Sequence, residues 1–128
     1  MKTISEKELN EYLESIGGLE NGWRIDGPTI KDCKAFSIGE GWYGLIKSLI
    51  EELVVLGWNK QITQVKEKFG SLRFYTSETT QEMQTVINKY EDLSAETCEH
   101  CGNQGKIEPK NGWLECVCGE HKYEPSKL

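Results

Sequence analysis

The amino-acid sequence predicts an α+β fold, in which helices pack on a small antiparallel β-hairpin or sheet and a cysteine-rich segment follows. Apolar residues recur at helical spacing in three separate segments, and β-branched and aromatic residues surround one Gly-Ser pair. Four of the five cysteines fall between residues 97 and 121. We therefore expect an α+β core domain over residues 1–96 and a second unit over residues 97–128.

The first helix is predicted to begin after Ser5, because Ser5 and Glu8 have the spacing of a capping box. Apolar residues then fall at positions i, i+3, i+4 and i+7 of one helical face: Leu9, Tyr12, Leu13 and Ile16. Gly17 and Gly18 are expected to end this helix. Residues 19–40 show little periodicity and carry turn signals, which indicates a long connection with one short strand.

The second helix is predicted over residues 42–56, where a single apolar stripe is typical of core packing. The stripe consists of Trp42, Leu45, Ile46, Leu49, Ile50 and Leu53. Gly57 follows as the C-terminal cap. The glycine-rich stretch at 39–44 has no phosphate-binding motif, and Glu40 would repel a phosphate. A tight turn with Trp42 as its core anchor is therefore favoured over a ligand loop.

Residues 61–76 predict a hairpin that turns near Gly70. Side chains alternate between the two faces of a strand, so Leu72 and Phe74 are expected on one face and Arg73 and Tyr75 on the other.

A third helix is predicted from a second capping box, Thr79 with Glu82, to about Ala95. Its apolar face is formed by Met83, Val86, Ile87, Tyr90 and Leu93.

The cysteine-rich segment has the spacing of a metal site. Cys98 and Cys101 form a C-x-x-C pair, and Cys118 and His121 form a C-x-x-H pair after an intervening loop of 16 residues. Zn²⁺ prefers four tetrahedral nitrogen and sulfur donors, which two such pairs supply. The predicted cofactor is thus Zn²⁺, held in a closed, structural site that resembles a zinc ribbon.

Two alternatives for the metal ligands stay open at this point. Cys116 could complete a four-cysteine set in place of His121, and His100 lies inside the first pair. We favour His121 because its pair with Cys118 repeats the two-residue spacing of the first pair. Disulfides or free thiols are the alternative to a metal.

Charge is unevenly distributed along the chain. The sequence has 15 Lys and Arg against 21 Asp and Glu, a formal net charge of −6, yet the hairpin region is cationic. An anionic small molecule such as a nucleotide suits a cationic patch on an acidic protein. The candidate ligand-binding residues are Lys66, Lys68, Arg73 and Tyr75, the last of which could stack on a base. The alternative is a solvated strand face on which lysines protect an edge.

Other functional classes are disfavoured by what the sequence lacks. Catalysis by a nucleophile needs a neighbouring base, and the chain has two histidines, of which His121 is expected to bind metal. Cys33, outside the cluster, is expected to be a buried, inert thiol. We therefore expect no enzyme. No apolar run approaches the ~20 residues that span a bilayer, and no export signal is recognised, so a cytoplasmic location without membrane contact is expected.

The string of residues 64–75, QVKEKFGSLRFY, resembles a group of small bacteriophage and prophage proteins of unassigned function. In that group a Gly-Trp-x-x-Leu-Ile element precedes the string, here at residues 41–46, and a C-x-x-C-G knuckle, a Trp and a C-x-x-H pair follow it. The resemblance covers about residues 39–121, and Cys116 is additional to the pattern. It implies an accessory factor that acts in the cytoplasm of a bacterial host.

These observations lead to one principal functional hypothesis and two alternatives. The principal hypothesis is a non-catalytic, zinc-stabilised binding protein, a phage-encoded accessory or counter-defence factor that binds an anionic, nucleotide-type host signal. The first alternative is an adaptor that inhibits or redirects a host protein. The second, a zinc-ribbon protein that binds nucleic acid, is less favoured because the chain is acidic. The three apolar helix faces are also compatible with a homo-oligomer.

Overall fold

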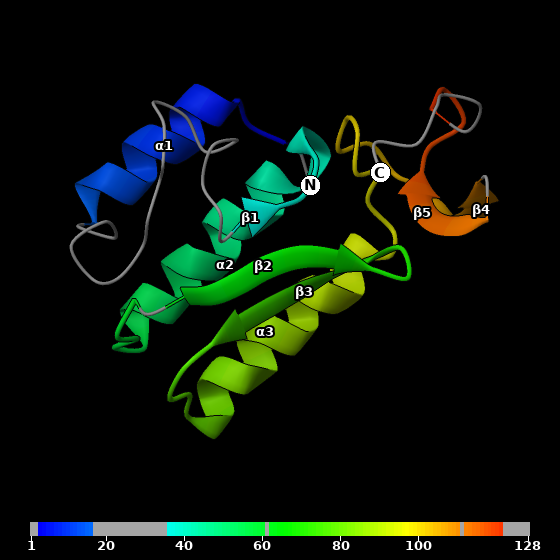
Figure 1. Ribbon diagram of the computed structural model, residues 1–128. Coiled ribbons are helices and arrows are strands. Elements are labelled where there is room, and N and C mark those ends of the chain that lie inside the picture. Colours follow the sequence, from blue (N-terminus) through cyan, green and yellow to red (C-terminus); the bar gives the residue numbers. More distant parts are fainter. Residues whose placement is uncertain (1–2, 17–35, 61, 111, 122–128) are drawn as a thin grey trace.

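A computed structural model describes residues 3–16, 36–60, 62–110 and 112–121 (Figure 1). The predicted helix end at Gly17 and Gly18, most of the 19–40 connection and Cys33 lie outside these residues. The described elements are α1 (Glu6–Ser15), β1 (Phe36–Ser37), a 3₁₀ turn η3 (Glu40–Trp42), α2 (Tyr43–Val55), β2 (Ile62–Lys68), β3 (Ser71–Thr76), α3 (Gln81–Ser94), β4 (Lys106–Lys110) and β5 (Trp113–Val117). They confirm the α+β prediction.

Helix α1 begins as the capping box predicts, because the Ser5 hydroxyl accepts a 3.1 Å hydrogen bond from the amide of Glu8. Its buried residues, Leu9 and Leu13, belong to the main hydrophobic core. Within the described residues, none of the helices has the length and apolar character needed to cross a membrane.

Helix α2 is the central element of the core. All six residues of its predicted apolar stripe are at most 1% exposed. The helix itself begins at Tyr43, one residue later than predicted, because Glu40–Trp42 form a 3₁₀ turn first. Trp42 is fully buried, and its indole N–H donates to the carbonyl oxygen of Thr97 at 2.8 Å. The expectation of a turn anchored by Trp42 is thus confirmed.

The main sheet has the order β1-β2-β3, with β1 parallel to β2 and β2 antiparallel to β3. The hairpin register pairs Val65 with Phe74 and Lys66 with Arg73. Val65 and Phe74 are buried, whereas Lys66 and Arg73 are partly exposed. The predicted alternation of the two faces is therefore confirmed, and β1 adds a short parallel strand to the predicted hairpin.

Helix α3 covers the outer edge of β3. The Ser94 hydroxyl accepts from the amide of Leu72 at 2.7 Å, and the Glu91 carboxylate accepts from the amide of Phe74 at 2.9 Å. Figure 1 shows α2 and α3 on the same side of the hairpin. Because side chains of α3 accept from two backbone amides of β3, this edge is less open to pairing with another strand.

The predicted start of α3 was wrong by one residue. Its N-cap is Thr80 rather than Thr79, since the Thr80 side chain accepts from the amide of Met83 at 3.2 Å. Two consecutive threonines offer the same hydroxyl, and the backbone conformation selects between them.

A second, two-stranded antiparallel sheet follows, formed by β4 and β5. It lies against the turn of the first hairpin: a Cβ added at Gly70 would be 2.9 Å from Ile107 Cγ2. Cys116, on β5, belongs to the same hydrophobic core as α2. The cysteine-rich segment is therefore packed directly onto the residues that precede it.

Candidate metal centre

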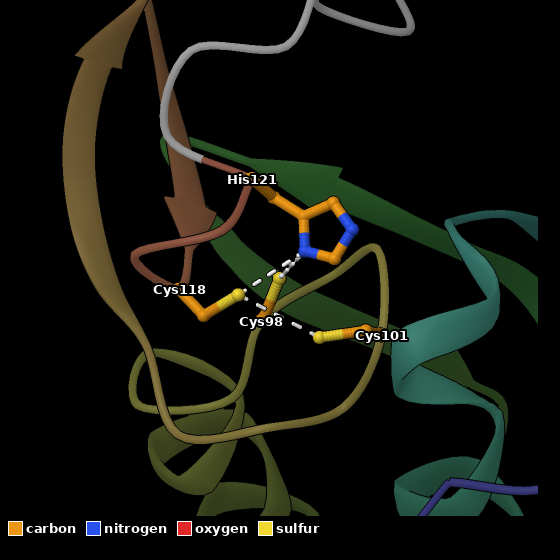
Figure 2. Close-up of side chains that lie close together, drawn as sticks. All are labelled: Cys98, Cys101, Cys118 and His121. Carbon is orange, nitrogen blue, oxygen red and sulfur yellow. Dashed lines mark hydrogen bonds between the residues drawn. The ribbon is translucent and has the colours of Figure 1, made fainter.

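The four predicted metal ligands lie together at the end of the second sheet (Figure 2). Cys98 and Cys101 come from the loop after α3, and Cys118 and His121 from the turn after β5. Their donor atoms, three sulfurs and one ring nitrogen, all lie within 4.8 Å of one another. The predicted set is thereby brought to one place, able to hold a metal ion.

Two of the distances among these donors match tetrahedral coordination, and a third is shorter. Zn–S and Zn–N bonds of about 2.3 and 2.05 Å at tetrahedral angles require about 3.8 Å between two sulfurs and about 3.6 Å between sulfur and nitrogen. Cys101 Sγ lies 3.7 Å from Cys118 Sγ, and Cys98 Sγ lies 3.6 Å from His121 Nδ1. The Cys118 Sγ to His121 Nδ1 distance is 3.1 Å. Around a zinc ion, Cys118 and His121 would therefore move apart by about 0.5 Å, whereas the other two distances would change little.

Tight turns aim both halves of the site. The amide of Gly102 donates to the carbonyl of Cys98 at 2.9 Å, and Gly102 has a φ of +84° that favours glycine. In the second half, the amide of His121 donates to the carbonyl of Cys118 at 3.1 Å. Each pair of donors is therefore held by one hydrogen-bonded turn, and both donors of the pair point toward the centre of the site.

Cys116 lies outside the site. It is fully buried, and its thiol donates to the carbonyl oxygen of Ala95 at 3.3 Å. Burial, followed by the negative charges around it, raises the pKa of the Cys116 thiol to about 12. It is not among the donors that lie together, so the four-cysteine alternative is not supported. Side chains of successive strand residues point to opposite faces, and on β5 the side chain of Cys116 points to the core.

His100 also lies outside the donor group, but next to it. Its ring stacks on that of His121, with centroids 5.2 Å apart and an interplanar angle of 11°. Its Nε2 pairs with the Glu115 carboxylate, and both side chains are less than 10% exposed. His100, paired with Glu115, thus stacks on a face of the His121 ring, and the Nδ1 atom of that ring lies next to the sulfurs. Sequence reasoning did not identify this pair, because nothing in the spacing links the two residues.

The loop of the first two cysteines is docked on the glycine-rich turn before α2. Gly41 donates from its amide to the carbonyl of Glu99 at 2.7 Å, and Gly39 donates to the Glu99 carboxylate at 2.8 Å. A Cβ at Gly41 would lie 2.1 Å from the carbonyl oxygen of Cys98. The glycine-rich turn therefore packs against the loop that carries Cys98 and Cys101, which we call the metal loop. Its sequence did not indicate this role.

The thiols of the site differ in acidity. Burial raises the pKa of Cys101 to about 11. Burial would also raise that of Cys118, but hydrogen bonds from the His121 side chain and from backbone amides lower its pKa to about 7. Cys118 accordingly forms a thiolate, the form that binds a metal, more readily than Cys101 does.

The predicted ligand-binding residues lie on the outward face of the main sheet. Lys66 is paired directly with Arg73, and Lys66 Nζ lies 5.9 Å from the centre of the Tyr75 ring. Lys68, two residues along β2, faces the same way. Within the part of the chain that the structure describes, these three cations form no ion pair.

The fold and the donor group define a small α+β protein with a Cys₃His group that could hold a metal ion. Comparison with protein-family models, with curated proteins and with solved structures found no match. The function of the chain is therefore inferred from its own residues.

Proposed function

We propose that this chain is a non-catalytic binding protein, stabilised by Zn²⁺ in the Cys₃His group, whose cationic sheet face binds an anionic, nucleotide-type ligand. The observation that carries the proposal is the direct pairing of Lys66 with Arg73 on the outward face. Lys68 and Tyr75 lie on the same face.

The zinc part of the proposal follows from the donor chemistry. Three sulfurs and one nitrogen complete a tetrahedral shell, so no coordination position is left for a substrate. Zinc in such a closed site stabilises the fold instead of acting in catalysis. The segment it holds consists of two strands of five residues, which bury little apolar surface of their own.

The anion part follows from unpaired charge. Lys66 and Arg73 are opposite each other, so two like charges face one another without an anionic partner among the described residues. Like charges directly opposite each other destabilise a sheet. An anion between them would remove this repulsion, and the Arg73 guanidinium can bind a phosphate through two hydrogen bonds.

The biological version of the proposal rests on the resemblance to small phage proteins. A zinc-stabilised protein that sequesters a nucleotide signal would act as an accessory or counter-defence factor in the cytoplasm of the bacterial host. Native mass spectrometry of protein purified from that host tests this version, because one spectrum reports zinc, subunit number and any retained ligand.

Isothermal titration calorimetry with cyclic nucleotides and cyclic ADP-ribose species tests the ligand class. We expect binding by the wild type, at least about tenfold weaker binding by Lys66→Ala and Arg73→Ala, and unchanged binding by Lys7→Ala. Lys7 is a matched control, since it is an exposed lysine of α1 that pairs with Glu11. The absence of heat at high micromolar ligand would contradict the proposal.

A protein-interaction adaptor is the second candidate, and the exposed apolar residues of β5 favour it. Trp113 is 57% exposed and Leu114 is 42% exposed. Exposed aromatic residues often anchor protein interfaces. A pull-down from host lysate distinguishes the candidates: an adaptor retains a polypeptide that Trp113→Ala releases, whereas a sequestering protein retains a small molecule.

A further inference from the structure

Phe69 occupies an unfavourable position at the tip of the first hairpin. Its φ is +54° and that of Gly70 is +85°, so both turn residues are in the left-handed region. Such turns favour Asn followed by Gly, whereas a bulky residue at positive φ is strained. The Phe69 side chain is 66% exposed and thus gains little from packing.

An exposed aromatic ring that strains the backbone points to a role outside the core. Lys68 Nζ lies 5.5 Å from the centre of the Phe69 ring, just as Lys66 Nζ lies 5.9 Å from that of Tyr75. Tyr75 is 40% exposed. Each of the two rings is therefore partly exposed and has a lysine ammonium over one of its faces.

The register orders these groups along the outward face. Three rows follow one another from the turn: Lys68 with Ser71, Lys66 with Arg73, and Gln64 with Tyr75. Successive rows on one face are about 7 Å apart, so about 14 Å separates the first row from the third. From the tip inward, the face thus presents an aromatic ring, two cationic rows and a second aromatic ring.

We infer that this face binds a short single-stranded oligonucleotide, with one base on Phe69, another on Tyr75 and the connecting phosphates on Lys66, Lys68 and Arg73. The inference rests on the proposed function and narrows its ligand class. Sites for single strands combine a basic track with aromatic side chains on which bases stack. A mononucleotide is too short to reach both rings, because two cationic rows separate them.

An acidic peptide would satisfy the cations but would leave the aromatic rings without a planar partner. A base would stack on the ring face opposite the lysine, and such stacking depends little on sequence. The rings therefore favour the oligonucleotide over a peptide, and the strained position of Phe69 is explained by contact with a base.

The experiment measures fluorescence anisotropy of a labelled oligothymidylate about six nucleotides long, with thymidine monophosphate and a polyglutamate peptide as competitors. We expect the oligonucleotide to bind at least about tenfold more tightly than the mononucleotide. Phe69→Asn, which suits the turn, should reduce oligonucleotide affinity about tenfold, and Phe69→Trp should retain it. Lys7→Ala, at an exposed lysine of α1 that pairs with Glu11, is the control and should bind as the wild type does.

The outcomes separate this inference from the proposed function. Equal affinity for mononucleotide and oligonucleotide would overturn the two-ring site and leave nucleotide binding intact. Effective competition by polyglutamate, with no effect of Phe69→Asn, would show that the surface binds anions by charge alone. This result would overturn base stacking on Phe69. Failure of every nucleotide to bind would overturn both proposals.

Discussion

The amide nitrogen of Gly41 lies 2.7 Å from the carbonyl oxygen of Glu99, and this hydrogen bond joins the turn before α2 to the loop of the metal site. Glu99 lies between Cys98 and Cys101, the two candidate metal donors of that loop. The backbones approach so closely that no side chain fits at Gly41. The metal loop and the central helix are therefore coupled mechanically.

Replacement of Gly41 by alanine is expected to destabilise the whole domain. The added Cβ would lie 2.1 Å from the Cys98 carbonyl oxygen, a backbone atom that cannot move independently. Overpacking and a weakened hydrogen bond should lower the free energy of unfolding by about 3 kcal/mol. Urea denaturation followed by circular dichroism measures this change.

Gly119→Ala is the matched control for Gly41→Ala. Nothing lies within 4 Å of a Cβ at Gly119, and its φ is not in the left-handed region. Its free energy of unfolding should change by less than about 0.5 kcal/mol. Equal effects of the two substitutions would show that the docking contact contributes nothing specific.

Removal of the metal is expected to unfold the second sheet. We expect one Zn²⁺ per chain by elemental analysis, which Cys98→Ser should abolish and Cys116→Ser should leave in place. Cys116 is the control because it is equally buried but its thiol donates to the Ala95 carbonyl, outside the donor group. Chelation should lower the Tm and remove amide protection from β4 and β5. Loss of zinc from Cys116→Ser would contradict the assigned ligands.

Phe69→Asn is expected to raise stability while it lowers ligand affinity. Asparagine tolerates the positive φ of this turn position, and the exposed ring contributes little to the core. The free energy of unfolding should rise by about 1 kcal/mol. Phe69→Ala removes the ring but keeps a residue that is unfavourable at positive φ. If Phe69→Ala raised the free energy of unfolding as much as Phe69→Asn does, in thermal or urea denaturation, backbone strain would not be the cause.

The raised pKa of the Tyr90 phenol leads to a prediction for the stability of the protein at alkaline pH. Burial, then the hydrogen bond to Glu52 and the charge of that carboxylate, raises the pKa of the Tyr90 phenol to about 12. The unfolded value is about 10. Because the folded pKa is the higher one, the phenol's contribution to stability is complete below pH ~10 and is lost between pH ~10 and ~12.

Denaturation of the wild type and Tyr90→Phe at a series of alkaline pH values tests this effect. We expect the stability of Tyr90→Phe to fall less steeply than that of the wild type between pH ~10 and ~12. The Tyr43 phenol, whose pKa burial also raises to about 12, should preserve part of the slope in both proteins. Identical slopes would show that folding does not raise the pKa of the Tyr90 phenol.

Much of the local structure could be predicted because it depends on residues close together in the chain. The apolar stripe of α2 and the alternation of Leu72 and Phe74 follow from the periods of helix and strand. The four donors that could hold a metal ion were also recognisable, since a two-residue spacing lets one turn present both donors. The start of α3 was less certain, because Thr79 and Thr80 carry the same capping group.

The supporting contacts of the site could not be predicted in this way. The pairing of His100 with Glu115 depends on how the cysteine loop meets β5. The exclusion of Cys116 depends on which face of β5 the core covers. Such contacts join residues that carry no common pattern in the chain.

The sequence by itself determined the α+β composition, the hairpin and the paired spacing of the candidate metal donors, because helix period, strand period and donor spacing are local properties of a chain. Only the tertiary structure decided that Gly41 seats the metal loop and that Lys66 faces Arg73. The contact of Gly41 with the metal loop depends on the packing of segments far apart in sequence. The position of Lys66 opposite Arg73 depends on the register of two paired strands. Both are selected by burial of the shared core and by the close approach that glycine permits.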